Sequence, residues 1–75
     1  MSMNFEDFVA SKYVIKCNNG GSIICYAGTH LANDPSQQVC ILRTPGNSYV
    51  LEIENHHYRD DLESLEEILW KWYID

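Results

Sequence analysis

Cysteine is scarce in this chain of 75 residues, and the few cysteines present follow no recognised pattern. Cys17, Cys25 and Cys40 are odd in number, and no two of them have C-x-x-C spacing. Small secreted domains usually have an even and dense set of cysteines that form disulfides. The N-terminus also lacks a basic segment followed by an apolar one, which is the pattern of a signal peptide. These absences predict a cytoplasmic protein with free and mostly buried thiols.

Catalytic and metal-binding motifs are also missing. The sequence contains no G-x-G-x-x-G, P-loop, H-E-x-x-H or EF-hand pattern. Gly20-Gly21 is not followed by a predicted helix, so the pair does not indicate a phosphate-binding loop. A zinc site that combines the cysteines with His30, His56 or His57 is an alternative, although no pair has zinc-ligand spacing. The sequence therefore predicts a protein that is not an enzyme and that uses no metal or cofactor.

Positive charge is scarce in the C-terminal third of the chain. Residues 52–75 contain eight acids and two bases, which accounts for the whole net charge of −6, whereas residues 1–51 are balanced. No apolar run approaches the roughly 20 residues of a membrane-spanning helix. An acidic segment is a poor direct ligand for nucleic acid or for an anionic membrane. The concentrated charge favours instead a surface that meets a basic protein.

Hydrophobic periodicity and turn residues predict one small α+β domain that spans residues 1–75. A short helix over 4–10 has Asn4 as its N-cap, and a C-terminal helix spans about 60–74 and packs on one face of a sheet. We expect about four antiparallel strands in two hairpins, at 12–17, 22–27, 38–44 and 49–54. The two hairpin turns lie over 18–21 and 45–48, with a polar loop over 28–37 and a connection over 55–59.

The register of each hairpin decides which side chains share a face of the sheet. A two-residue turn at Asn19-Gly20 places Cys17 opposite Ser22. In the second hairpin, a loop over 45–48, or a two-residue turn within it, places Leu42 opposite Leu51. The sheet is thus expected to have two distinct faces.

One of these faces is predicted to be the core face. Its members are Tyr13, Ile15, Cys17, Ile24, Tyr26, Cys40, Leu42, Tyr49, Leu51 and Ile53. The other face also carries sizeable apolar residues, namely Val14, Ile23, Val39, Ile41 and Val50. An apolar surface of this size is unfavourable in water, so the sequence predicts a homodimer, or a partner that covers this face.

The C-terminal helix has an apolar stripe that is expected to pack on the sheet. Its members are Leu62, Leu65, Ile68, Leu69, Trp72 and Tyr73. Trp70 lies outside this stripe beside Glu63 and Glu66, and it either packs over the sheet edge or the N-terminal helix, or faces a partner. On the second reading, this flank is a partner-binding surface made of Glu63, Glu66, Glu67, Trp70 and Ile74.

These features favour a small acidic protein–protein interaction module. Its most concrete form is an inhibitor of a basic nuclease or nucleic-acid-binding protein, with the acidic helix acting as a nucleic-acid mimic. Immunity proteins and phage anti-restriction or anti-CRISPR proteins act in this way as classes, and they serve here as a physical analogy. One alternative is a homodimeric structural or accessory subunit that associates through the sheet. The other is a small enzyme or ligand binder that uses His56 and His57.

Overall fold

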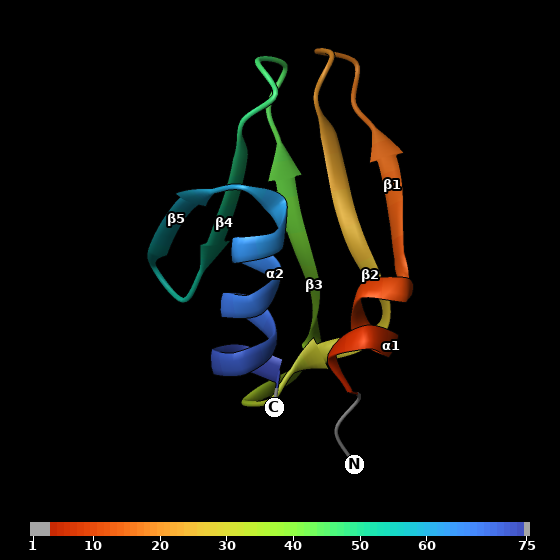
Figure 1. Cartoon of the computed structure of the whole chain (residues 1–75), viewed down its shortest axis with the longest axis vertical. Coiled ribbons are helices and arrows are strands. Elements are labelled where there is room, and N and C mark those ends of the chain that lie inside the picture. Colours follow the sequence, from red (N-terminus) through yellow and green to blue (C-terminus); the bar gives the residue numbers. More distant parts are fainter. Residues whose placement is uncertain (1–3, 75) are drawn as a thin grey trace.

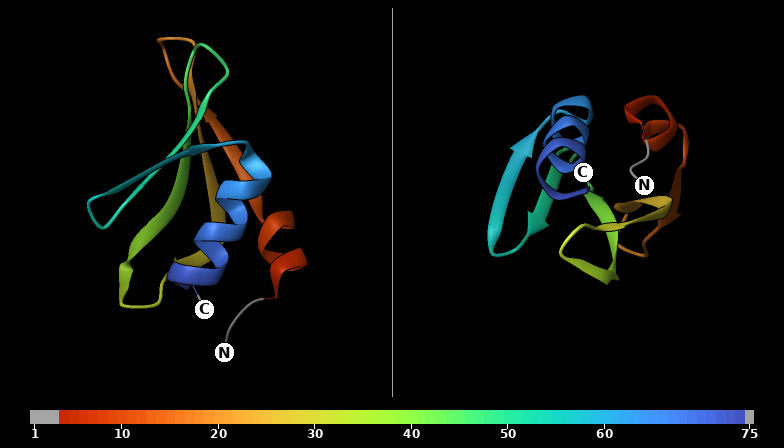
Figure 2. Two further views of the ribbon diagram at one scale, coloured as in Figure 1. Left: turned by 60° about the vertical axis from the view of Figure 1, so that its left-hand side comes forward. Right: turned by 90° about the horizontal axis from the view of Figure 1, so that it is seen from below.

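Two helices and five strands make up the fold, known from a computed structural model that describes residues 4–74, with the backbone alone at position 35. In chain order the elements are α1 (Phe5–Ala10), β1 (Lys12–Lys16), β2 (Ser22–Leu31), β3 (Asp34–Arg43), β4 (Tyr49–Ile53), β5 (His56–Asp60), α2 (Leu62–Leu69) and a π-helical turn, η1 (Trp70–Ile74). The strands form one antiparallel sheet in the order of the chain. Both helices lie on the same face of this sheet (Figures 1 and 2). The predicted α+β fold is confirmed.

The sheet has one strand more than the sequence predicts. The predicted connection over 55–59 is β5, which pairs with β4 from Tyr49↔Asp60 to Ile53↔His56. The turn between them consists of Glu54 and Asn55, with φ angles of 48° and 68°. Two consecutive positive φ angles are typical of a type I′ hairpin turn, where asparagine is common and glutamate is not. The glutamate therefore hides the turn from a search for turn residues.

The predicted polar loop over 28–37 is mostly strand as well. β2 continues to Leu31 and β3 begins at Asp34, and these two residues are paired across a tight turn. Gly28 has a φ of 72° within β2, and the register between β2 and β3 shifts between Cys25 and His30. An irregularity of this kind lets a long strand bend while it stays in the sheet.

The first hairpin turn occurs where predicted, but its loop has three residues rather than two. The Cys17 N–H donates to the Gly21 carbonyl at 2.9 Å, and the Gly20 N–H donates to the Cys17 carbonyl at 3.3 Å. Gly20 has a φ of 90°, so a turn is followed by a left-handed residue, which is a common three-residue loop. As a result Lys16, and not Cys17, lies opposite Ser22.

The second hairpin has the same type of loop. The Thr44 N–H donates to the Ser48 carbonyl at 2.8 Å, and Asn47 takes the left-handed position with a φ of 65°. Leu42 is therefore opposite Val50 rather than Leu51. Side chains alternate between faces with a period of two, so a change of one residue reverses one strand relative to its partner. The predicted division of the sheet into two faces is consequently wrong in part.

The core lies between the sheet and the two helices. Phe8 of α1 stacks on Tyr26 of β2 with their ring centroids 4.4 Å apart. The buried core residues are Phe8, Ile24, Tyr26, Leu31, Val39, Ile41, Leu51, Ile53, Leu65 and Leu69. Val39 and Ile41 thus face the helices, contrary to their predicted place on the open face.

The face of the sheet that points away from the helices is called the outer sheet face below. Its apolar members follow from the strand register, and they are Tyr13, Ile15, Ile23, Cys25, Cys40, Leu42 and Val50. Tyr13, Ile15, Cys40 and Leu42 were expected in the core. Val14 shares the face of Ile24, yet 54% of it is exposed. The β1–β2 and β3–β4 hairpins extend beyond both helices (Figure 1), so part of the helix-facing side of the sheet is left uncovered and Val14 can be exposed there.

Candidate functional site

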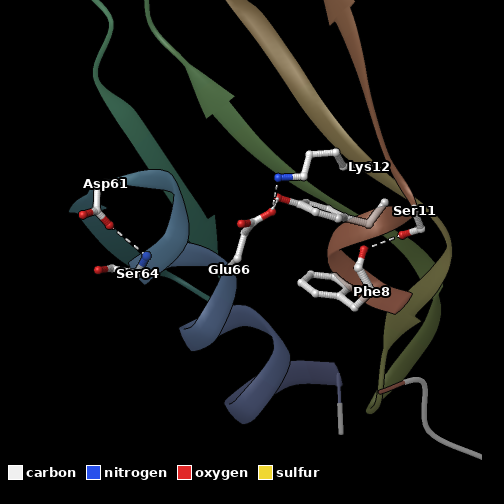
Figure 3. Close-up of polar contacts among 7 residues, drawn as sticks. Phe8, Ser11, Lys12, Asp61, Ser64 and Glu66 are labelled. Carbon is white, nitrogen blue, oxygen red and sulfur yellow. Dashed lines mark hydrogen bonds and ion pairs between the residues drawn. The ribbon is translucent and has the colours of Figure 1, made fainter. Parts of the chain in front are cut away.

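Glu66 of α2 is buried at the centre of a polar cluster between the helix and the sheet. Only 3% of the residue is exposed. Its Oε2 atom accepts a hydrogen bond from the Tyr26 hydroxyl at 2.8 Å and lies 2.9 Å from Lys12 Nζ. Figure 3 shows the carboxylate reaching from α2 toward Lys12. Burial, and then the bond to Glu66, raise the pKa of Tyr26, so the phenol remains a hydrogen-bond donor.

This cluster changes the interpretation of the acidic helix. A buried carboxylate needs a charged partner and hydrogen bonds to offset its lost hydration, and Lys12 and Tyr26 supply them. Glu66 therefore joins α2 to β1 and β2, and its predicted place on a partner-binding surface is wrong. Helical periodicity places Glu66 on the flank of the helix beside Trp70. Its partners Lys12 and Tyr26 lie far away in the sequence, so the periodicity does not reveal them.

Trp70 and Ile74 also pack inward. The Trp70 ring makes an edge-to-face contact with Phe5 of α1, with the ring centroids 5.5 Å apart. Ile74 packs against the core and is partly buried. Trp70 thus follows the alternative in which it covers the N-terminal helix. Neither side chain projects fully from the surface as a partner-binding anchor.

Two of the predicted acids, Glu63 and Glu67, remain exposed on the outer side of α2. Asp60 and Asp61 are exposed just before the helix and extend the acidic surface. Asp61 is the N-cap, and its Oδ1 accepts a hydrogen bond from the Ser64 N–H at 2.8 Å. That hydrogen bond lowers the pKa of Asp61, so the cap is negatively charged at neutral pH.

Trp72 is the aromatic residue that projects from this part of the molecule. It is 69% exposed, although the sequence places it in the core stripe. Trp72 lies in η1, where the wider π-helical turn changes the direction of side chains relative to an α-helix. Lys71 Nζ lies 5.3 Å from the centroid of the Trp72 ring. No feature of the sequence signals the π-helical turn.

Trp72 borders a shallow hollow of about 410 Å3, which is also lined by Tyr58, Ile68 and Tyr73. The hydroxyls of Tyr58 and Tyr73 are hydrogen-bonded at 3.0 Å. This bond raises the pKa of Tyr73 to about 12, so the Tyr73 phenol is neutral near pH 7. An exposed aromatic beside a partly apolar hollow, five residues after Glu67 in the chain, is a suitable feature for contact with another protein.

The residues predicted to form a dimer face are divided between the two sides of the sheet. Ile23 and Val50 lie on the outer sheet face, whereas Val39 and Ile41 are in the core. The apolar groups that are exposed on the outer sheet face are Tyr13, Ile15 and Leu42. An apolar outer surface therefore exists, but with a different membership.

The thiols of Cys25 and Cys40 lie side by side on the outer sheet face. Their Sγ atoms are 3.2 Å apart, and all three cysteines are free. Gln38 Nε2 donates a hydrogen bond to the Tyr13 hydroxyl at 2.6 Å. Both of these side chains come from strands that flank β2, which explains why Cys25 is buried. Burial and the bond to Cys25 raise the pKa of Cys40 to about 12.

The histidines singled out in the sequence do not gather into a cluster with the cysteines. His56 and His57 are exposed on β5, and His57 Nδ1 lies 3.6 Å from Glu52 Oε1 on the surface. Within residues 4–74, no group of three or more His, Cys, Asp and Glu side chains is placed to hold a metal ion. The part of the chain that is described contains no helix both long and apolar enough to span a membrane.

Comparison with family models, with curated proteins and with solved structures found no match for this chain. The candidate surfaces therefore rest on the geometry of this molecule.

Proposed function

We propose that this protein binds a basic protein through the outer side of α2 and the adjoining η1. The observation that carries the proposal is that Glu63, Glu67 and Trp72 are all exposed on the C-terminal helical segment, while Glu66 is buried in the core. Exposed acids attract a basic partner over a distance and raise the association rate. An exposed tryptophan provides an anchor that slows dissociation.

An inhibitor of a nuclease or of another nucleic-acid-binding protein is the most specific form of this proposal. Such proteins have a basic groove for phosphates, and carboxylates on a rigid helix can occupy it. Lys12 is engaged with Glu66, so it does not offset the exposed acids of α2. Lys71 is the base nearest to Glu67 along the helix and stacks on Trp72 instead.

Affinity capture from native cells, followed by mass spectrometry, tests whether a basic protein is bound. Binding of the purified partner to the variant Glu63→Lys/Glu67→Lys should then weaken by more than about tenfold, mainly through slower association. Glu6→Lys/Asp7→Lys is a matched control, because these acids are exposed on α1 and the change in net charge is the same. Normal binding by the α2 variant at physiological salt would contradict the proposal.

A homodimeric accessory subunit is a second candidate function, favoured by the outer sheet face. Tyr13, Ile15 and Leu42 are each at least 41% exposed there. Sedimentation of the wild type and of Ile15→Lys would test it, and the variant should shift a dimer toward monomer. A wild type that stays monomeric at high micromolar concentration would exclude it.

A further inference from the structure

The sheet opens between β3 and β4. These strands are paired at Leu42↔Val50 and Arg43↔Tyr49 alone, whereas β4 and β5 are paired at five positions. β3 has ten residues, so most of its length lies beyond the last pair. Figure 2 shows the β4–β5 hairpin turning away from β3 below this point. The facing edges of the two strands separate there, and we call the space between them the β3–β4 slot.

The slot contains a cavity of about 520 Å3. Its apolar lining comes from both strands and from α2, and includes Val39, Leu51 and Leu69. Its acidic lining is Asp34, Glu52 and Glu54, and the described lining residues include no base. The Asn33 amide donates a hydrogen bond to Glu54 at the far end. A negatively charged rim thus surrounds an apolar interior.

The unpaired edge of β3 determines how a ligand could lie in the slot. The edge of a strand without a neighbour presents N–H and C=O groups at regular intervals, and an extended peptide can pair with them. Side chains of such a peptide alternate between two faces of the sheet. Val39 and Leu51 face the helix side, whereas Glu52 belongs to the outer side. The slot therefore suits alternating apolar and basic side chains.

We propose that the β3–β4 slot binds an extended basic segment of a partner protein, which adds as a strand to the edge of β3. The apolar side chains of the segment would point toward Leu69, and its lysines or arginines would pair with Asp34, Glu52 and Glu54. Charge complementarity favours this occupant over a neutral or acidic peptide. The site is separate from the outer side of α2, so it does not depend on the proposed function.

The test uses the whole protein and a short fluorescent peptide of alternating lysine and valine. We expect saturable binding by fluorescence anisotropy, weakened by about tenfold or more in the variant Glu52→Lys/Glu54→Lys. The variant Glu63→Lys/Glu67→Lys has the same change in net charge on α2 and should bind within about twofold of the wild type. The opposite ranking is expected for a partner captured by α2, so the two proposals fail independently.

Two further peptides test the proposal on the wild-type protein, without any substitution in the chain. A version methylated at alternate backbone nitrogens should lose binding, because it cannot donate hydrogen bonds to a strand edge. A glutamate–valine version should not bind. The amides of β3 and β4 that line the slot should show slower hydrogen exchange with the lysine peptide.

Absence of saturable binding, equal binding of the methylated peptide, or equal losses in the two charge variants would each overturn the proposal. So would self-association of the protein that fills the slot with a second copy and excludes the lysine peptide.

Discussion

The inner and outer sides of α2 carry the same kinds of residue in opposite surroundings. Glu66 on the inner side is enclosed by Tyr26 and Lys12, whereas Glu67, the next residue, is exposed. The two tryptophans differ in the same way. Trp70 contacts Phe5, and Trp72 projects into solvent. Within two turns of helix, an acid and an aromatic stabilise the fold, while a second acid and a second aromatic remain available for contact.

The difference follows from the cost of burying charge. A carboxylate loses its hydration when it is enclosed, so it remains in the core only where hydrogen bonds and an opposite charge replace the water. An exposed carboxylate needs no such partners and contributes to the field around the protein. Removing Glu66 should therefore affect stability, and removing Glu67 should affect binding.

The largest loss of stability is expected where the inner side of α2 meets the sheet. Leu69 is fully buried, so Leu69→Ala should reduce the free energy of unfolding by about 2–5 kcal/mol. Leu42→Ala is the control on the outer sheet face, where 42% of the residue is exposed, and it should cost less than about 1 kcal/mol. Urea denaturation measures both. Equal losses would mean that α2 does not form the core contact.

A smaller loss is expected when the buried acid is removed. Glu66→Ala leaves the Tyr26 hydroxyl without its acceptor, and should cost about 1–3 kcal/mol in the same measurement. The loss of stability should stay below the upper end of this range, because Lys12 is about one-third exposed and can regain water once Glu66 is removed. Glu67→Ala should change the free energy of unfolding by less than about 0.5 kcal/mol. The inner–outer distinction fails if the two alanine variants are equally stable.

The tryptophans give the same comparison with aromatic residues. Trp70→Ala removes the contact with Phe5 and should cost about 1–2 kcal/mol, because the side chain is only partly buried. Trp72→Ala should leave stability nearly unchanged, but should speed dissociation of a partner bound to α2. Thermal unfolding and binding kinetics of the two variants separate the roles. A destabilised Trp72→Ala would show that η1 packs differently.

The smallest effect concerns the N-cap of α2 and depends on pH. The pKa of Asp61 is lowered in the folded protein, so the charged cap adds stability above its unfolded pKa of about 3.9. That contribution should decline once the pH falls below about 4, where the unfolded carboxylate takes up its proton, and it is lost as the pH falls through the lower pKa of the folded state. Asp61→Asn keeps an acceptor at the cap without this titration. The stability advantage of the wild type over this variant should shrink between pH 7 and about pH 3.

The local signals in the sequence were sufficient for the fold class and for much of the chain's organisation. Asn4 caps α1 through the Asp7 N–H, and both predicted hairpin turns occur at the expected places. The concentration of acids in residues 52–75 is a property of the sequence itself. Each of these features depends on neighbouring residues, which is why a sequence pattern can specify it.

The division of the sheet into faces required the tertiary structure. Turn residues indicate where the chain reverses, but a second hairpin loop of three residues, instead of the expected four or two, moved Ile41 from the predicted open face into the core. The sheet has a side-chain period of two, so this single residue decides which face is buried. Local preferences at the turn do not distinguish loops of two, three and four residues.

The candidate site shows the same limit. The sequence identified Glu63 and Glu67 as exposed acids, but it also placed Glu66 among them and left Trp72 in the core. Tyr26, which binds Glu66, is 40 residues away along the chain. Helical periodicity gives the direction of a side chain from its helix, whereas burial of a charge depends on partners that only the folded chain brings together.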